Sequence, residues 1–382
     1  MEAALKERRA SPVRSAAATG KATLLGKLDG ATSAERRPTG SSELDRVVGG
    51  GLVPGSVVLL GGDPGIGKST LLLQVGARVC ADASVLYATG EESASQVAAR
   101  AGRLGLDVAN LQLMSEPSLD VILEAARESK AALLIVDSIQ TVYLPEVAAS
   151  AGGVSQLREC AAALVRYAKS TSTTVLIIGH VTREGTIAGP KVLEHLVDTV
   201  LYFESDAGSR YRIVRATKNR FGAVNELAFF AMTESGLKEI ANPSAIFLAR
   251  PTEIAPGSLV TVAREGGRPL LVEIQGLVDP MRFGNPRRVA QGLDATRLAM
   301  LLAVLNRHGG LSLQDHDVFA NVVGGLSLHE TASDLPVLLT LASSLRDKPL
   351  PATLVAFGEV GLTGEVRPVA YGEERLREAA KQ

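Results

Sequence analysis

Cysteine is scarce in this sequence and tryptophan is absent, since the 382 residues include two cysteines and no tryptophan. Both cysteines, Cys80 and Cys160, fall within helical patterns and have no neighbouring cysteine or histidine. A disulfide framework needs several paired cysteines, and a structural zinc site needs a cluster of cysteine or histidine ligands. We therefore expect neither a disulfide nor bound zinc, and we interpret both cysteines as small buried apolar residues.

Long apolar runs and net charge are also lacking. No apolar stretch approaches the ~20 residues needed to cross a bilayer, and the first residues contain no apolar signal core. The sequence therefore supports neither export nor a membrane span, and the cytoplasm is the expected location. The 40 Lys and Arg residues nearly balance the 41 Asp and Glu residues. The overall charge thus indicates no polyanionic partner, and any nucleic-acid surface must be local.

What the sequence does contain is a phosphate-binding loop. In GGDPGIGKST, residues 61–70, Gly62 is followed by four residues and then by Gly67, Lys68 and Ser69. Glycines let consecutive backbone N–H groups surround the β-phosphate, Lys68 can reach the β and γ oxygens, and the Ser69 hydroxyl can coordinate Mg²⁺. We predict that ATP or GTP is bound by Gly62, Asp63, Pro64, Gly65, Ile66, Gly67, Lys68, Ser69 and Thr70.

The residues around this loop have the order that the chemistry requires. A β-branched apolar run over 55–62 is typical of a buried parallel strand, and residues 70–79 have apolar side chains at helical spacing. A helix beginning at Ser69 would point its positive dipole end at the phosphates. Strands and helices then alternate, which indicates an α/β fold with a mostly parallel sheet covered on both faces. The expected strands are 85–93, 111–116, 131–142 and 173–180, and the expected helices are 93–105, 118–130 and 152–170.

Polar residues stand at the ends of three of these strands. Ligands of a parallel sheet bind outside the carboxyl ends of its strands, so these residues should converge on one edge. Asp137 is the expected Walker B carboxylate, which would hold Mg²⁺ opposite Ser69. Glu91 and Glu92 stand where a base for the attacking water should lie. Adjacent side chains point in different directions, so we favour Glu91 as the base and leave Glu92 as a helper or a helix-start charge.

His180, at the third strand end, and the loop after it each have two open interpretations. His180 could sense the γ-phosphate, or it could be a satisfied core histidine. Arg183 and Lys191 follow among glycines. They could contact a phosphodiester backbone, or they could be solvated surface charges.

A second basic segment, SRYRIVRATKNRFG, covers residues 209–222. Five basic residues fall between Arg210 and Arg220 with no acid among them. Lys218 and Arg220 are expected at the tip of a turn before Gly222. From there a cation could reach the γ-phosphate of a neighbouring subunit, or DNA.

Changes in composition divide the chain into three expected parts. Residues 1–36 form a basic leader that we expect to be flexible, residues 37–240 form the nucleotide-binding domain, and residues 241–382 form a smaller α+β domain. Near the start of the nucleotide-binding domain, Ser41 or Ser42 could cap a short helix that ends at the glycines 49–51. The α+β domain has expected strands at 246–248, 257–264, 269–277 and 353–358 and expected helices at 294–307 and 334–345.

Several of these motifs together resemble the RadA (Sms) family of bacterial DNA-repair proteins. The resemblance covers roughly residues 37–382 and rests on GGGLVPGSVVLLGGDPGIGKSTLLLQ, ATGEES, LLIVDSIQT, GHVTREGTIAGPKVLEH and, most specifically, KNRFG. It implies a RecA-like P-loop ATPase core followed by a Lon-protease-like (S5-like) domain, in a hexameric ring on single-stranded DNA. It also implies branch migration of branched DNA in company with a RecA-type recombinase. The motif residues that it implies to act between subunits or on DNA are Lys218, Asn219, Arg220, Phe221 and Gly222.

Two features depart from the family pattern. The family usually begins with a four-cysteine zinc finger, whereas residues 1–36 contain no cysteine, so zinc binding is not transferred to this chain. The second domain stops at LREAAKQ, before a Lon-like domain would be complete. Either the sequence is truncated here, or the last strand and helix of such a domain are absent from it.

A Lon-like domain also raises the hypothesis of a protease. Lon enzymes need a serine nucleophile activated by a lysine, whereas the alignment places Asp334 at the nucleophile position and Glu373 at the lysine position. We therefore predict that the domain is not a protease and assign it to ring assembly and DNA contact. The basic residues that could contact DNA, or be solvated surface, are Arg282, Arg287 and Arg288.

The sequence thus predicts a DNA-dependent, helicase-like ATP hydrolase that acts as a motor on single-stranded DNA in homologous recombination and repair. The alternative is a nucleotide-dependent oligomeric switch or adaptor that recruits partners without translocating. The acidic residues at the strand ends favour hydrolysis, which a switch also performs. The dependence of the ATPase rate on DNA is therefore the property that separates the two.

Overall fold

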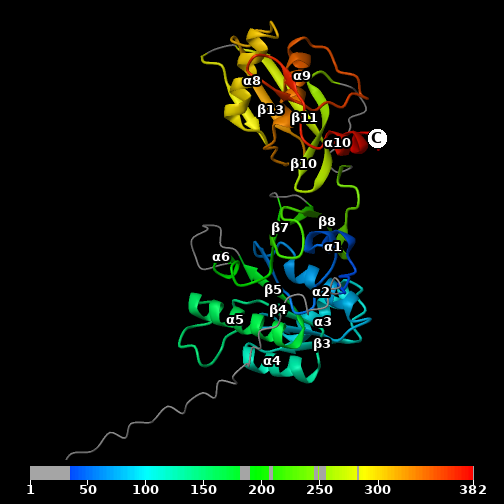
Figure 1. Ribbon diagram of the computed structural model, residues 1–382, viewed down its shortest axis with the longest axis vertical. Helices are drawn as coiled ribbons and strands as arrows, with labels where there is room; N and C mark the ends of the chain where they lie inside the picture. Colours follow the sequence, from blue (N-terminus) through cyan, green and yellow to red (C-terminus); the bar gives the residue numbers. More distant parts are fainter. Residues whose placement is uncertain are drawn as a thin grey trace, which may run out of the picture. The chain divides into compact units, whose positions relative to one another are not determined.

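Among the residues that the structure describes, a nine-stranded and a four-stranded sheet form the framework, and a two-stranded sheet accompanies them (Figure 1). The computed structural model describes residues 35–180, 190–205, 210–244, 248, 255–281 and 284–381. Most of the predicted leader lies outside these residues. The larger sheet belongs to the nucleotide-binding domain and the smaller one to the α+β domain that follows, so the two-part α/β architecture expected from the sequence is confirmed.

Among the described residues, the larger sheet has nine strands in the order β3-β2-β4-β5-β1-β6-β7-β8-β9. Neighbouring strands are parallel from β3 to β6 and antiparallel from β6 to β9. The mostly parallel sheet is therefore confirmed, and the structure adds an antiparallel extension. The strands are β1 (Val57–Gly62), β2 (Val85–Thr89), β3 (Leu111–Ser115), β4 (Leu133–Asp137), β5 (Thr174–His180), β6 (Thr199–Glu204), β7 (Tyr211–Asn219), β8 (Leu227–Thr233) and β9 (Gly236–Glu239).

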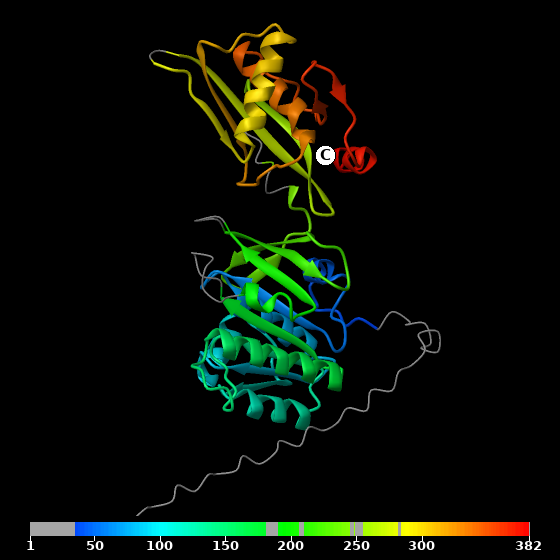
Figure 2. The same cartoon turned by 60° about the vertical axis from the view of Figure 1, so that its left-hand side comes forward.

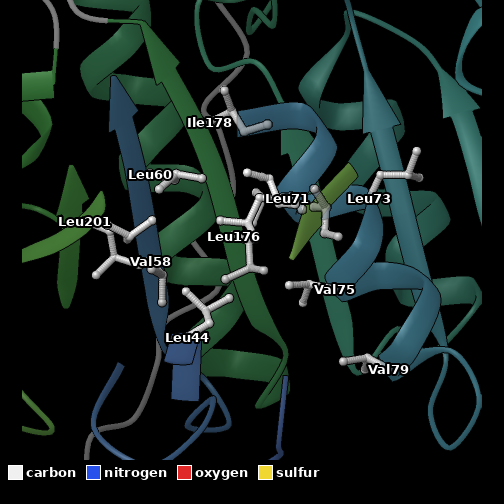
Figure 3. Close-up of a cluster of buried hydrophobic side chains, with 14 of the residues drawn as sticks. Leu44, Val58, Leu60, Leu71, Leu73, Val75, Val79, Leu176, Ile178 and Leu201 are labelled. Atoms are coloured by element: carbon white, nitrogen blue, oxygen red, sulfur yellow. The ribbon is translucent and has the colours of Figure 1, made fainter. Parts of the chain in front are cut away.

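The central strand β1 is buried on both faces. Val58 and Leu60 belong to one hydrophobic cluster, which Figure 3 shows, and Val57 and Leu59 belong to a second cluster. Successive side chains of a strand point to opposite faces, so helices have to cover both sides of the sheet. The first cluster includes residues of α1 (Ser42–Val48), α2 (Lys68–Val79) and α3 (Ala94–Arg103), and the second includes residues of α4 (Leu119–Glu128), α5 (Val154–Thr171) and α6 (Pro190–Leu193).

The helix ends follow local capping rules. The Ser41 hydroxyl accepts a hydrogen bond from the backbone N–H of Leu44, and α1 ends at Gly49 with a left-handed φ of 92°, as predicted. Helix α3 begins with a capping box between Ser93 and Gln96. Ser118 is the N-cap residue of α4, but its side chain makes no capping hydrogen bond.

The smaller sheet has the order β10-β11-β13-β12, counted over the described residues. Its core joins apolar residues of the strands to those of α8 and α9, and Figure 2 shows these helices beside the sheet. The predicted helices 294–307 and 334–345 are confirmed as α8 and α9. The elements are β10 (Ser258–Glu265), β11 (Arg268–Pro280), β12 (Arg288–Gln291), α8 (Ala295–Arg307), β13 (His316–Val322), the 3₁₀ turn η2 (Thr331–Ser333), α9 (Asp334–Leu345), β14 (Glu359–Val360), β15 (Val366–Arg367) and α10 (Gly372–Ala379).

The strand predictions were wrong or incomplete in several places. Residues 353–358 do not form a strand, since only Val355 makes an isolated bridge, to Val260. Strand β13 was missed because polar residues interrupt the apolar pattern of HDVFANV. The apolar run 131–142 also forms a shorter strand than predicted, because its last residues leave the sheet after Asp137 and bury Ile139 in a loop. Most of the predicted strand 246–248 lies outside the described residues.

Both cysteines lie in the hydrophobic clusters that flank the larger sheet. Cys80 and Cys160 are free and buried, as predicted, and burial raises the pKa of the Cys160 thiol to about 12. In the part of the chain that the structure describes, no helix has the length and apolar character needed to cross a bilayer.

Gln156 provides a test of packing in the nucleotide-binding domain. Its buried side-chain amide accepts from Leu144 N at 3.0 Å and donates toward the carbonyl oxygens of Leu144, Val147 and Ala149 at 3.0, 3.0 and 3.1 Å. Gln156→Ala leaves these buried groups unpaired, so we expect a loss of about 2–4 kcal/mol in unfolding free energy. Urea denaturation followed by circular dichroism measures it. The exposed Gln112→Ala is the control, and equal losses in both variants would contradict the prediction.

Candidate active site

The phosphate loop connects the end of β1 to the start of α2, in the strand, loop and helix order that was predicted. Gly62 and Gly67 have φ values of 153° and 117°, within the left-handed region that favours glycine. A Cβ atom at Gly62 would also lie 2.7 Å from the carbonyl oxygen of Phe203 on β6. The glycine at position 62 is therefore required by the close passage of a neighbouring strand as well as by the turn.

Helix α2 begins at Lys68, one residue earlier than predicted. Its first N–H groups have no partners within the helix, and its dipole places partial positive charge at this end. The first turn contains no acidic residue. The start of α2 can therefore receive the anionic phosphate groups of a nucleotide.

Lys68 is held against the loop from which it comes. Its Nζ donates to the carbonyl oxygens of Gly62 at 2.7 Å and Asp63 at 2.8 Å, and the residue is 3% exposed. Burial lowers the pKa of the Lys68 ammonium to about 8, although the nearby charges of Asp137, Glu91 and Asp63 oppose the shift. A triphosphate would add further negative charge beside this group and favour its protonated form.

Asp137 ends β4 and lies next to the phosphate loop, as predicted for a Walker B carboxylate. Its Oδ2 accepts a hydrogen bond of 2.6 Å from the Tyr87 hydroxyl, while its buried Oδ1 has no hydrogen-bond partner among the described residues. Burial raises the pKa of Asp137, whereas the Tyr87 and Ser69 hydroxyls favour its charged form. Burial and the Asp137 charge also hold the pKa of Tyr87 well above its usual value, so that its hydroxyl stays a donor.

These residues fit the metal that an ATPase requires. The unpartnered Oδ1 of Asp137 and the nearby Ser69 hydroxyl are hard oxygen donors of the kind that Mg²⁺ prefers. The described residues contain no group of three or more His, Cys, Asp or Glu side chains that could hold an ion. A magnesium site here therefore relies on nucleotide phosphates for its remaining ligands, as is usual for this ion.

Glu91 and Glu92 have different surroundings. Glu91 Oε1 lies 3.1 Å from His180 Nε2 and accepts a hydrogen bond from the Ser138 hydroxyl. The hydrogen bond with His180 is the largest cause that lowers the pKa of Glu91, so this carboxyl is ionised near neutral pH. Glu92 instead forms an ion pair with Arg100 of α3. Only Glu91 is directed to the neighbouring strand ends, which supports its choice as the base.

His180 ends β5 beside Glu91, so the three predicted strand ends do come together at one edge of the sheet. The carbonyl oxygen of His180 accepts from Gln140 Nε2 at 3.3 Å, and its ring Nδ1 is buried with no hydrogen-bond partner among the described residues. The contact with Glu91 distinguishes His180 from a histidine enclosed in an apolar core. This placement favours the sensor interpretation.

The KNRFG motif lies at the opposite edge of the same sheet. Asn219 ends β7 and pairs with Thr199, the first residue of β6, and Thr199 pairs with Val58 near the start of β1. Lys218 Nζ donates to the carbonyl oxygens of Glu194 at 2.6 Å and Val197 at 2.9 Å. Burial lowers the pKa of Lys218, as does the positive charge of Arg220.

The rest of the motif packs beside the end of α1. Asn219 Nδ2 donates to the Val47 carbonyl oxygen at 3.2 Å, and a Cβ atom at Gly222 would lie 2.8 Å from Gly49 Cα. Arg36 donates to the carbonyl oxygen of Phe221 at 2.8 Å. The backbone of the motif is therefore fixed, whereas the Arg220 side chain is 58% exposed.

The other predicted DNA contacts have mixed placements. Arg183 and Arg282 lie outside the described residues, as does the side chain of Lys191, whose backbone belongs to α6. Arg287 makes a two-pronged contact with Asp317, at 2.9 and 2.7 Å. Arg288 donates to backbone carbonyl oxygens of its own domain, including that of Leu313 at 2.6 Å.

Three residues near the site were not identified from the sequence. The Tyr87 hydroxyl donates to Asp137, and the Ser138 hydroxyl donates to Glu91. Arg212 Nε donates to the carbonyl oxygen of Ile66 in the phosphate loop at 3.2 Å. Tyr87 did carry a signal, because a buried tyrosine inside an apolar strand usually needs a partner for its hydroxyl.

Comparison with known proteins agrees with this geometry. A family model described as an AAA domain matches residues 25–186. The DNA repair protein RadA of Pseudomonas aeruginosa is 59% identical over 346 residues, which are 91% of this chain and 76% of the relative. The chain belongs to the RadA family. The RadA proteins of Escherichia coli K12 and Bacillus subtilis are 57% and 51% identical, over 91% and 92% of this chain and 75% and 77% of their own lengths.

Membership of the RadA family confirms the resemblance carried by the motifs. The chain is a DNA-repair protein with an ATPase domain, which binds nucleotide together with a metal.

The lowered pKa of Lys68 predicts that ATP binding weakens in alkaline solution. Below pH about 8 the ammonium of the nucleotide-free protein is charged, and above it the charge is lost. Because bound phosphate favours the charged form, the Kd for ATP should rise about tenfold per pH unit above this value. Titration calorimetry between about pH 7 and 9.5 measures the slope. Lys68→Arg keeps a cation throughout, so an equal slope in this variant would contradict the assignment.

The surroundings of Glu91 and Glu92 predict different effects of neutralising them. Glu91→Gln should slow ATP hydrolysis about 100-fold or more, because the water loses its base, while ATP binding is retained. Glu92→Gln removes an ion pair with Arg100 and should change the rate by less than about 5-fold. Single-turnover hydrolysis and nucleotide titration measure the two properties. A larger loss in Glu92→Gln would reverse the assignment.

Proposed function

We propose that this chain is a DNA-dependent ATPase that acts as a motor on single-stranded DNA and promotes branch migration of recombination intermediates. The observation that carries the proposal is the placement of Arg220 and Lys218 at the edge of the sheet away from their own phosphate loop. Residues that are needed for the chemistry but lie far from the chain's own nucleotide are expected to serve a neighbouring subunit.

The register of the sheet sets the distance between Arg220 and the phosphate loop of the same chain. The backbone N–H of Arg220 donates to the carbonyl oxygen of Asp198, and Asp198 N donates to the Val57 carbonyl oxygen at the start of β1. The phosphate loop follows Gly62 at the other end of β1. Val57 and Gly62 are five residues apart along the strand, which corresponds to about 16 Å. This separation supports a site completed between subunits, and we infer a homo-hexameric ring.

The residues of the site would divide the work of hydrolysis. Lys68 and the N-terminus of α2 bind the phosphates, Glu91 orients the attacking water, and the guanidinium of Arg220 from the next subunit stabilises the charge that develops on the γ-phosphate. Mg²⁺, held by Ser69 and Asp137, would neutralise charge on the phosphate oxygens. The water attacks in line with the bond to the leaving diphosphate.

His180 could connect this chemistry to DNA. It touches Glu91 at 3.1 Å and is followed directly by the residues that carry Arg183. Contact of Arg183 and Lys191 with DNA stays a prediction. We further propose that a RecA-type recombinase supplies the branched intermediates.

We assign the second domain to ring assembly and DNA contact and infer that it is not a Ser–Lys protease. Asp334, at the position predicted for a nucleophile, is 1% exposed and accepts a hydrogen bond of 3.0 Å from Arg297 Nε. Glu373, at the lysine position, lies in α10 with an 88% exposed side chain and pairs with Arg377. A buried aspartate paired with an arginine and an exposed glutamate supply neither a nucleophilic hydroxyl nor a neutral amine.

A nucleotide-dependent oligomeric switch or adaptor is the second candidate. It is favoured by the contacts that both motif cations already make within their own chain, where Lys218 bonds to two carbonyl oxygens and Arg220 pairs with Asp198 at 3.1 Å. Such a protein would assemble around nucleotide and recruit partners without translocating.

Steady-state ATPase rates with and without single-stranded DNA separate the two candidates. A motor should be accelerated by DNA, and a rate that is indifferent to DNA would reject it. Native mass measurement in the presence of ATP and DNA tests the ring, because a hexamer supports assembly whereas a monomer at working concentration contradicts a site shared between subunits.

Replacing the motif lysine tests its role in DNA-dependent work. Lys218→Ala should bind ATP within about 2-fold of the unaltered protein, because the residue is remote from its own phosphate loop. DNA-stimulated hydrolysis and branch migration should fall about tenfold or more. Lys238→Ala, which removes an exposed lysine of β9, is the matched control. Unaltered branch migration by Lys218→Ala would refute the assignment.

A further inference from the structure

We propose that Tyr87 is a positioning residue for the metal-binding carboxylate, because its hydroxyl fixes one oxygen of Asp137 and leaves the other available to Mg²⁺. The inference rests on the proposed magnesium-dependent hydrolysis and adds a residue that the phosphate-loop and Walker B motifs do not include. It concerns how Asp137 is held, and the effect of Tyr87 on the reaction is through that carboxylate alone.

The two oxygens of Asp137 are in different situations. Oδ2 accepts the Tyr87 hydroxyl at 2.6 Å, whereas the buried Oδ1 has no hydrogen-bond partner among the described residues. Leaving a buried carboxylate oxygen unpaired is costly. The arrangement is understandable if the free oxygen is a ligand position that a cation occupies during the reaction cycle.

Tyr87 is itself rigidly placed. It is fully buried in the cluster between the sheet and α2, and its backbone pairs with Leu113 on one side and Ile135 on the other. A ring held in this way has one direction in which its single hydroxyl proton can be donated. Hydrogen bonds to metal-ligating carboxylates orient the ligand and tune its affinity for the metal.

The same strand also delivers the proposed base. The hydroxyl of Thr89, two residues after Tyr87, accepts the backbone N–H groups of Glu91 and Glu92 at 3.2 Å each. Thr89 pairs with Asp137 in the register of β2 and β4. Strand β2 therefore fixes the metal carboxylate through Tyr87 and fixes the start of the Glu91 loop through Thr89.

A role in packing alone predicts a different result from a role in positioning. Phenylalanine keeps the ring and its apolar contacts and removes one oxygen. If Tyr87 only fills the core, Tyr87→Phe affects nucleotide binding equally with and without Mg²⁺. If it positions Asp137, the variant specifically weakens the part of nucleotide binding that depends on Mg²⁺.

The experiment measures the affinity for a nonhydrolysable ATP analogue in EDTA and over a titration of Mg²⁺. For Tyr87→Phe we expect the Mg²⁺ concentration of half-maximal tightening to rise about tenfold. Affinity in EDTA should stay within about 2-fold of the unaltered protein, which also shows that the site is folded. Tyr167→Phe is the matched control, since Tyr167 is buried in the same domain and its hydroxyl lies 3.5 Å from Thr173 Oγ1.

Asp137→Asn distinguishes failure of this inference from failure of the proposed function. If Asp137→Asn raises the Mg²⁺ requirement and Tyr87→Phe does not, the role of Tyr87 is overturned. If Asp137→Asn leaves the requirement unchanged, the proposed magnesium site itself is wrong and the inference falls with it. The double variant should be no worse than Asp137→Asn alone, because Tyr87 acts through that carboxylate. Additive losses would overturn the inference.

Discussion

One electrostatic constraint organises the nucleotide-binding domain: a lysine ammonium has to stay charged while it is buried. Lys68 is 3% exposed, and burial brings its pKa to about 8. The charge is retained at neutral pH because two loop carbonyl oxygens accept hydrogen bonds from the ammonium and because Asp137 and Glu91 lie nearby. The parallel sheet makes this possible, because it brings the ends of β1, β2 and β4 together at one edge.

The same sheet places the phosphate loop and the KNRFG motif at opposite ends of β1, and we propose that the motif serves a neighbouring subunit. The phosphate loop follows the end of β1, whereas the KNRFG motif is fixed beside the start of that strand by Asp198 and the end of α1. Asp198 is buried and also accepts from Val57 N at 3.0 Å and Lys169 Nζ at 2.9 Å. Its charge is therefore compensated, and it holds Arg220 in a direction that the neighbouring elements determine.

The second domain contains a smaller sheet packed with helices, and several of its polar residues bond within the domain. The predicted nucleophile position is an aspartate locked to Arg297, and the predicted basic contacts Arg287 and Arg288 bond within the domain. Removing Arg297 would leave the charge of the buried Asp334 uncompensated. The ion pair between Asp334 and Arg297 therefore has a structural role that needs no catalysis.

Short-range patterns were sufficient for the phosphate loop, the cap at Ser41 and the helices α8 and α9, because the groups involved lie within a few residues of one another. The sequence also favoured Glu91 over Glu92 as the base. The structural support for that choice is a contact with His180, which is 89 residues away in the sequence. The Tyr87–Asp137 bond spans 50 residues and depends on β2 lying beside β4. Contacts between residues so far apart in the sequence depend on which strands lie side by side. Neither the composition nor the periodicity of a short segment determines that order. Likewise, KNRFG was recognisable as a motif, but only the pairing of β6 with β1 and β7 showed that it lies beside the start of β1, at the other end of that strand from the phosphate loop.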